Sequence, residues 1–321
     1  MEKTNFKPAW WLPGPHLQTL WPTLMRRRKK LPLRREQIEL QDGDFVDLDW
    51  MPQSTGPIVL VLHGLEGSAK SPYAQGMLTA LSKQGWRSAV MHFRSCSGTT
   101  NRLSRMYHSG DTADVAEVIH TLKTREPTTP IAVVGFSIGG NVLLKLLGES
   151  DQDDSLVAAV AVSVPFELNK SVDRLQRGFS RIYQRYFLRR LKNKIRQKFN
   201  EQAAPITLPL SKSLKTIRQF DDKVTAPLHG FADAEDYYVK SSSRQFLKSI
   251  HVPTLILQAK DDPFMPASVI PTADELSPAI TLEVSRRGGH VGFVSGVVPG
   301  RPRYWLEERV PAFLSGYLQS V

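Results

Sequence analysis

Short runs of apolar residues alternate along most of the chain with longer stretches in which apolar positions follow a helical period. The apolar runs are rich in Val, Ile and Leu, as is typical of buried strands in a parallel sheet. This alternation predicts an α/β fold: a mostly parallel, twisted sheet flanked by helices, preceded by a hairpin that turns at Asp42-Gly43. The predicted strands are residues 37–40, 45–50, 57–62, 87–92, 131–134, 156–164, 252–259 and 280–284, and the predicted helices are residues 73–84, 112–123, 141–147, 232–248 and 304–318.

Two parts of the chain depart from this alternation. Residues 1–35 are rich in Pro and Trp and have no sustained period, so we expect an arm that lies over the domain. Residues 165–230 contain no predicted strand, and apolar side chains recur every three to four positions over residues 175–199. We therefore predict a core of residues 36–164 and 231–321, with a helical, basic insertion between them that covers the sheet edge as a lid. The apolar face of this insertion could pack on the core, line an acyl pocket or lie on a membrane surface.

The strand predicted at residues 131–134 passes directly into a helix through Gly135-Phe-Ser137-Ile-Gly139, a G-x-S-x-G pattern. Such a sharp turn forces its junction residue into a strained conformation, and the two glycines lack the Cβ atoms that would collide there. The turn exposes the serine Oγ at the sheet edge, so Ser137 is the candidate nucleophile. The helix that follows is predicted to end at Gly148.

A serine needs a base to accept its proton, and the base needs an acid to orient it. The chain supplies these groups in the order Ser, Asp, His, each just after a predicted strand, which is the order used by the α/β-hydrolase fold. Since parallel strands end at one sheet edge, Ser137, Asp262 and His290 should converge there. We choose Asp262 because it stands four residues before Pro266, a spacing common in this fold, and we keep Asp261 as the alternative.

The strand at residues 57–62 ends in the Gly-bearing turn His63-Gly-Leu-Glu-Gly-Ser68, which can present backbone N–H groups to an oxyanion. We predict that the N–H groups of Leu65 and Ile138 are the donors. Ser137 would then attack an acyl carbonyl, and water activated by His290 would release the acyl group. This chemistry requires no cofactor and no metal.

A polar loop over residues 94–111 carries His108 and Cys96, either of which could line the site, although we expect both to be structural. Cys96 is the single cysteine, so the chain has no internal disulfide. There is neither a CxxC nor an HExxH pattern, and no segment has the order of a signal peptide. From these features we expect a cytoplasmic protein.

The net charge of +11 is concentrated in two stretches, residues 26–35 and 170–198. In the second stretch eleven Lys and Arg residues accompany a single acid, Asp173. Such a patch fits an anionic membrane surface, nucleic acid or an acidic substrate. For this chain we expect a small-molecule ester or lipid as substrate, with the anionic membrane as a candidate peripheral partner of the basic insertion, and no nucleic acid.

Taken together, the motifs resemble those of the AB hydrolase 4 family of the α/β-hydrolase superfamily, over nearly the whole chain. One position differs, because Ser95 stands where relatives usually have glycine. The resemblance implies a serine esterase (a carboxylesterase) acting on carboxylic esters, with short- or medium-chain acyl groups or lipids as substrates. The matching segments are His16-Leu-Gln-Thr19, His63–Ser68, His92–Gly98, Gly135–Asn141, Ala259–Phe264 and Gly288–Phe293.

Two alternatives to ester hydrolysis stay open at this point. An acyltransferase would use the same triad and pass the acyl group to an alcohol instead of water. A non-catalytic basic protein would bind a membrane or nucleic acid through residues 170–198, and its binding would depend strongly on salt.

Overall fold

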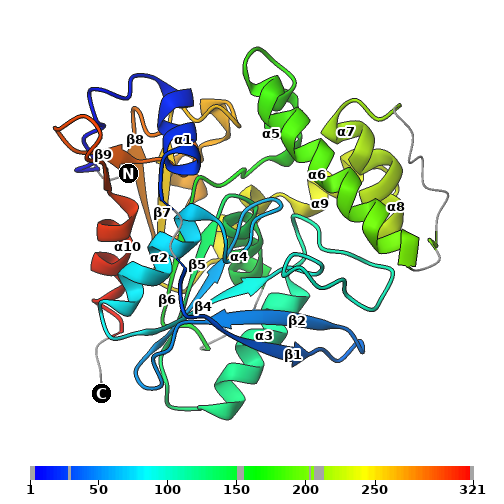
Figure 1. Ribbon diagram of the computed structural model, residues 1–321, viewed down its shortest axis with the longest axis horizontal. Helices are drawn as coiled ribbons and strands as arrows, with labels where there is room; N and C mark the ends of the chain where they lie inside the picture. Colours follow the sequence, from blue (N-terminus) through cyan, green and yellow to red (C-terminus); the bar gives the residue numbers. More distant parts are fainter. Residues whose placement is uncertain (1–3, 28–29, 150–154, 202–203, 206–212, 319–321) are drawn as a thin grey trace.

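The computed structural model describes residues 4–27, 30–149, 155–201, 204–205 and 213–318. Its centre is an eight-stranded sheet with the strand order β1-β2-β4-β3-β5-β6-β7-β8 (Figure 1). The β1–β2 hairpin and the β2–β4 pair are antiparallel, and all other neighbours are parallel, as predicted. The strands are β1 (Arg34–Glu39), β2 (Phe45–Trp50), β3 (Ile58–Leu62), β4 (Arg87–His92), β5 (Ile131–Phe136), β6 (Ala158–Val162), β7 (Thr254–Ala259) and β8 (Ile280–Ser285).

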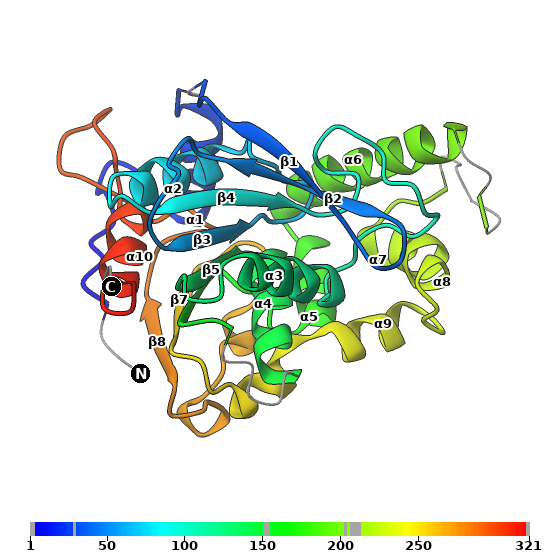
Figure 2. The ribbon, with the colours of Figure 1, turned by 90° about the horizontal axis from the view of Figure 1, so that it is seen from below.

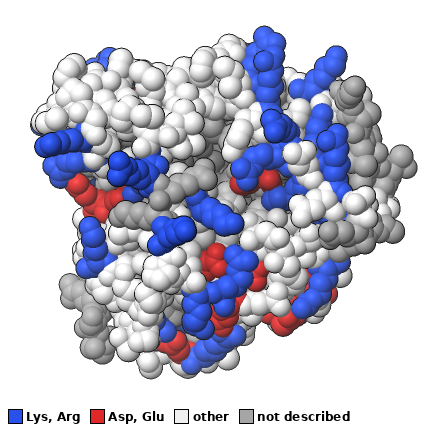
Figure 3. Space-filling view, viewed as in Figure 1, with Lys and Arg blue, Asp and Glu red and all other residues white. Residues whose placement is uncertain are grey.

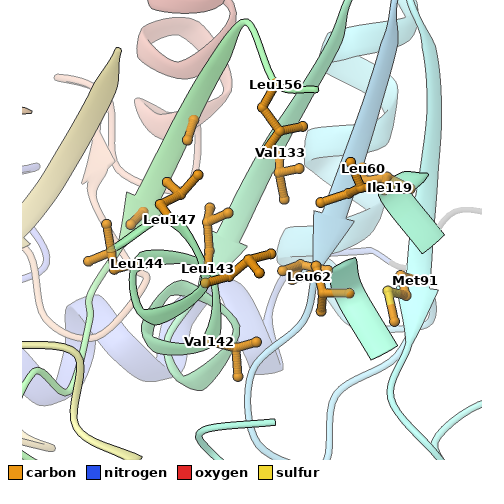
Figure 4. Packing of buried hydrophobic residues seen from close by; sticks show 14 of the residues in the cluster. Leu60, Leu62, Met91, Ile119, Val133, Val142, Leu143, Leu144, Leu147 and Leu156 are labelled. Carbon is orange, nitrogen blue, oxygen red and sulfur yellow. The ribbon is translucent and has the colours of Figure 1, made fainter. Parts of the chain in front are cut away.

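Helices cover both faces of this sheet, which explains why its central strands are apolar at every position (Figure 2). Side chains alternate between the two faces along a strand, so Leu60 and Val133 pack toward α3 (Ala113–Arg125) and α4 (Ile138–Glu149) (Figure 4). Their neighbours on the opposite face pack toward α2 (Pro72–Ser82) and α10 (Leu306–Leu314). Burying one such leucine or valine side chain stabilises the fold by about 2 kcal/mol.

One predicted helix is divided in two. The helix expected over residues 232–248 is observed as α9 (Ala234–Ser241) followed by a 3₁₀ helix, η2 (Ser243–Ser249). Ser242 between them is extended, with ψ of 128°. Asn141 of α4 holds this break, because its side chain donates to the Ser241 carbonyl at 2.7 Å and accepts from the Ser243 N–H at 3.0 Å.

The stretch that lacks strands folds as helices beyond the sheet edge. These elements, called the cap helices below, are α5 (Leu168–Leu175), α6 (Ser180–Glu201), α7 (Ile217–Phe220), the π turn η1 (Asp221–Thr225) and α8 (Ala226–Leu228). Of these, α6, α7 and α8 lie at the right in both views (Figures 1 and 2). The predicted domain boundaries, and the division into arm, core and insertion, stay predictions. Residues 202–203 and 206–212 of the expected insertion, and residues 28–29 of the first basic stretch, lie outside the described residues.

The expected arm contains a helix that the sequence analysis did not predict, α1 (Pro15–Leu24). Proline at its first position and Pro22 within it interrupt the hydrophobic period from which helices are recognised. The arm packs against a small hairpin of β9 (Val294–Ser295) and β10 (Arg303–Tyr304), where the Ala9 N–H donates to the Val294 carbonyl at 2.9 Å. Two short 3₁₀ turns, η3 (Ala267–Val269) and η4 (Ala273–Glu275), lie between β7 and β8.

Candidate active site

Ser137 sits at the turn between β5 and α4 in a left-handed backbone conformation, with φ of 54°. A non-glycine residue in this region is strained, and such strain clusters at functional sites. The turn is so tight that a Cβ on Gly139 would lie 2.6 Å from the Leu62 carbonyl oxygen of β3. The Ser137 N–H donates to the Val162 carbonyl at 2.8 Å, which fixes the turn against β6.

Three predicted site residues meet in one chain of hydrogen bonds. His290 Nε2 lies 2.9 Å from Ser137 Oγ, and His290 Nδ1 lies 2.7 Å from Asp262 Oδ2. Both His290 and Asp262 are buried. The second carboxylate oxygen of Asp262 accepts the Phe264 N–H at 2.8 Å, so the acid is oriented from both sides. This is the arrangement in which a serine can pass its proton to the imidazole.

The neighbouring carboxylate, Asp261, points elsewhere. Its Oδ1 accepts the Gly289 N–H at 3.0 Å, so it binds the backbone of the histidine loop instead of the imidazole. Burial raises the pKa of Asp261, with the hydrogen bonds from Gly289 and Gly288 acting in the opposite direction. Of the two candidates, the structure therefore brings Asp262 to the histidine.

The histidine loop is held by residues that the sequence analysis did not assign to the site. Thr19 of α1 accepts the His290 N–H at 2.9 Å while its hydroxyl donates to the Pro15 carbonyl at 2.8 Å. The Phe264 ring stacks on the imidazole with centroids 3.9 Å apart. Thr19 belongs to the His16–Thr19 motif of the family resemblance, and this was the available signal that the arm reaches the site.

The two predicted oxyanion donors, Leu65 and Ile138, both lie beside Ser137 and line the same cavity. Within the described part of the chain, neither N–H group has a protein acceptor. Backbone N–H groups inside a protein rarely lack an acceptor. Since these two have none, they are free to bind a ligand oxygen. The adjacent His63 is fully buried, and burial lowers the pKa of its imidazole to about 3. It stays neutral and bridges two strand ends, with Nδ1 2.7 Å from the Gly64 carbonyl and Nε2 accepting the Phe93 N–H.

A cavity of about 100 Å³ extends from Ser137 beneath the cap helices. Most of its wall is apolar, and its polar wall includes Asp221 and His108. Burial and the nearby His229 hold the pKa of His108 well below its usual range, so this imidazole is neutral. The apolar wall includes Leu168, Val172, Leu175, Phe187, Leu191 and Ile217.

A second space of about 350 Å³ opens from the same serine toward the surface. This outer groove runs between α1, the loop that follows β3 and α6, and its wall is more polar, with Ser68, Lys70 and Arg190 among the lining residues. Cys96 lines neither space, and its Sγ lies 2.8 Å from Lys194 Nζ. Ser137 and His290 therefore lie where an apolar cavity and a more polar groove join.

The described residues contain neither a candidate metal centre nor a membrane-spanning helix. Nowhere in this part of the chain do three or more His, Cys, Asp or Glu side chains gather as metal ligands would. No helix that the structure describes has both the length and the apolar composition needed to cross a bilayer.

Comparisons with known proteins identify the family of the chain. Residues 57–297 match the family model described as the alpha/beta hydrolase fold. The chain is 46% identical over 313 residues to YheT of Escherichia coli (strain K12), whose name classes it provisionally as an esterase, with 95% of this chain and 91% of YheT covered. It is 30% identical to the phospholipase ABHD3 of Mus musculus, with 94% of this chain and 76% of that protein covered.

Solved structures agree on the fold. The Pyrococcus furiosus esterase Pf2001 superposes with a TM-score of 0.58 at 19% identity, covering 90% of this chain and 94% of that one. The family resemblance and the fold class predicted from the sequence are thereby confirmed. The chain is an enzyme of the α/β-hydrolase family, a hydrolase related over nearly its whole length to proteins named esterase and phospholipase.

Proposed function

We propose that the protein is a serine carboxylic-ester hydrolase that acts through Ser137, His290 and Asp262 and a covalent acyl-enzyme. The observation that carries this proposal is the continuous hydrogen-bond chain from Ser137 Oγ through the imidazole to the buried carboxylate. The strained turn that presents the serine, and the two unpaired N–H groups beside it, support the same chemistry.

The reaction follows from the positions of these groups. His290 Nε2 accepts the proton of Ser137 as its Oγ attacks the ester carbonyl, and the N–H groups of Leu65 and Ile138 bind the oxyanion. The imidazolium, stabilised by Asp262, then protonates the departing alcohol. Water enters, gives its proton to the same imidazole and releases the acid.

The two spaces that meet at Ser137 suit the two parts of an ester substrate. We assign the acyl group to the apolar inner cavity and the alcohol to the more polar outer groove. The small volume of the inner cavity, about 100 Å³, favours short- or medium-chain acyl groups. The relatives named esterase and phospholipase support esters, including lipids, as the substrate class.

The first test is hydrolysis of p-nitrophenyl esters from acetate to laurate by the wild type and by Ser137→Ala. We expect a rate maximum at one acyl length and a loss of at least about 10³-fold in the variant. Equal rates in the two proteins would exclude the proposed nucleophile. Adding a primary alcohol to the assay distinguishes hydrolysis from acyl transfer, because a transferase would form the new ester in preference to the free acid.

A second proposal concerns the exposed face of α6, which fits an anionic lipid surface. Arg181, Arg185 and Arg189 lie on this face, and no ion pair joins any of them to an acid among the described residues. Exposed apolar side chains lie between them, Ile182 at 51% and Tyr186 at 55% exposure. Lys and Arg gather over this part of the molecule (Figure 3). Basic groups interleaved with apolar ones are typical of helices that rest on anionic membranes, and Tyr186 also lines the outer groove.

Vesicle sedimentation tests this surface. We expect the wild type to bind phosphatidylcholine vesicles that contain about one third phosphatidylglycerol, and to bind pure phosphatidylcholine weakly. Replacing Arg181, Arg185 and Arg189 by Gln should weaken binding about tenfold or more. A matched control replaces the exposed Lys83, Lys248 and Arg286 by Gln. If the control variant loses as much binding, or if the vesicle charge has no effect, this surface is not the docking site.

A further inference from the structure

The loop that carries the predicted oxyanion donor Leu65 is held by a helix more than a hundred residues away in the chain. The next residue, Glu66, is buried in a left-handed conformation, with φ of 55°. Its carbonyl oxygen accepts from Arg190 Nη2 of α6 at 2.8 Å, and its carboxylate lies 2.7 Å from Lys194 Nζ of the same helix. The backbone and the side chain of Glu66 are therefore both bound by the cap helices.

Tyr107 closes this set of contacts on the other side. Its phenol oxygen accepts the Glu66 N–H at 3.0 Å, and its hydroxyl donates to Glu66 Oε1 at 2.9 Å. On the preceding side, the Gly64 N–H donates to the Tyr73 hydroxyl at 2.8 Å. The N–H groups of Gly64 and Glu66 are thus both occupied, whereas the N–H of Leu65, which lines the cavity, has no acceptor among the described residues.

We propose that Lys194 and Arg190 are positioning residues for catalysis: through Glu66 they hold the Leu65 N–H where the oxyanion forms. This inference rests on the proposed function, since it assigns a role to the oxyanion loop. A displacement of about 1 Å at such a donor costs on the order of a hundredfold in rate. A left-handed, non-glycine residue also keeps its conformation only where its surroundings enforce it, and here α6 supplies a large share of those contacts.

The contact has the features of a positioning device more than of a stabilising ion pair. Buried ion pairs add little net stability, because desolvation offsets their attraction. Arg190 binds the backbone carbonyl, which is the atom whose position sets the orientation of the loop. The proposal therefore predicts an effect on turnover that exceeds the effect on folding.

The test compares Lys194→Met and Glu66→Gln with the wild type on p-nitrophenyl acetate. Lys194 lines neither the inner cavity nor the outer groove, so its loss should leave substrate contacts intact. We expect kcat to fall between about tenfold and a hundredfold in both variants, with KM changed less than about threefold. Binding of a trifluoromethyl ketone, which forms a tetrahedral oxyanion on the serine, should weaken by the same factor as kcat/KM falls. Lys194→Arg, which keeps the charge, should retain most of the activity.

Controls separate this inference from its premise. Gln197→Ala, an exposed change on the same helix that lies in neither space at the serine, should leave kcat unaltered. The double variant Glu66→Gln/Lys194→Met should be no slower than the worse single variant, because both remove the same contact. An unchanged kcat in a folded Glu66→Gln protein, or a loss expressed only in KM, overturns the inference. If Ser137→Ala keeps its activity, the proposed function itself has failed, whatever the results for the Lys194 and Glu66 variants.

Discussion

Two adjacent aspartates, Asp261 and Asp262, show how finely the site depends on single side chains. Both follow β7, and both lie close enough to the histidine loop to bind it. Asp262 reaches the imidazole at 2.7 Å, whereas Asp261 binds the backbone N–H of Gly289. The first can fix the tautomer of His290 and stabilise its charge, and the second can only hold the loop.

We therefore expect Asp262→Asn to lower kcat by about 10⁴-fold, because the amide holds the imidazole in the wrong tautomer. Asp261→Asn keeps an oxygen that accepts the Gly289 N–H, so its kcat should fall less than about tenfold. Steady-state kinetics of the two variants on one p-nitrophenyl ester, with circular dichroism to check folding, decides between them. A larger loss in the Asp261 variant would reverse the assignment.

Ser95 shows that the backbone conformation also depends on single residues. It adopts φ of 61°, a region in which glycine is at ease, and glycine is the residue that the family resemblance predicts at this position. Its hydroxyl compensates in part, since it donates to Asn101 Oδ1 at 2.6 Å and accepts the Asn101 N–H at 3.2 Å. The one departure from the family pattern that the motifs revealed therefore falls on a strained position outside the triad.

At the scale of secondary structure elements, the strands were predictable and some helices were not. A buried parallel strand must be apolar on both faces, so residues 57–62 and 131–134 carry a strong local signal. The break at Ser242 and helix α1 depend instead on distant partners, Asn141 for the first and the histidine loop for the second. The same holds in the site: the proposed triad follows from motif and order, whereas Glu66 and Thr19 make contacts with distant parts of the chain that hydrophobic periodicity does not encode.

Gly148 illustrates such a distant constraint. The sequence suggested that it ends α4, but the helix continues to Glu149, and a Cβ at Gly148 would lie 2.3 Å from the Phe246 carbonyl oxygen of η2. The glycine is needed for close packing of α4 on η2. Replacing glycine by alanine within a helix ordinarily stabilises it by up to about 1 kcal/mol.

Here Gly148→Ala should instead destabilise the protein, by about 1–3 kcal/mol, because backbone has to move to admit the methyl group. The free energy of unfolding from urea denaturation measures this effect. Gly178→Ala serves as a comparison: its Cβ would meet no atom, but its φ of 53° disfavours alanine by about 1 kcal/mol. A gain in stability for Gly148→Ala would mean that η2 packs on α4 less closely than the contact between Gly148 and Phe246 indicates.

At the scale of the whole molecule, buried polar networks join the sheet to the cap helices. Arg94 is almost fully buried and binds Asp44 at 2.7 Å and Asp114 at 2.6 Å. Asn101 extends this network, because it donates to Asp44 and accepts from Lys198 of α6 at 2.7 Å. Burial lowers the pKa of Lys198 to about 8. Charged groups thus connect the hairpin, α3 and α6, so the stability of the molecule as a whole depends on pH.

A second buried group, Asp221, should dominate this dependence in mildly acidic solution. Its two oxygens accept from Tyr238 and Thr225, each at 2.7 Å, and burial raises the pKa of its carboxyl to about 6 from an ordinary value of 3.8. The folded protein therefore binds a proton more tightly than the unfolded chain between these two values. It follows that Asp221 favours folding most below pH 4 and that its contribution declines as the pH rises toward 6, where it levels off.

Asp221→Asn removes this titration. The difference in unfolding free energy between variant and wild type therefore isolates the contribution of Asp221 from those of all other groups. Since one pKa unit corresponds to 1.36 kcal/mol, we expect the stability of the variant relative to wild type to increase by about 2 kcal/mol between pH 4.5 and pH 7. Urea denaturation of both proteins across this range measures the change. A difference that is flat with pH would show that Asp221 is not the titrating group, and one that falls with pH would mean that its carboxylate is stabilised by its two hydroxyl donors more than it is penalised by burial.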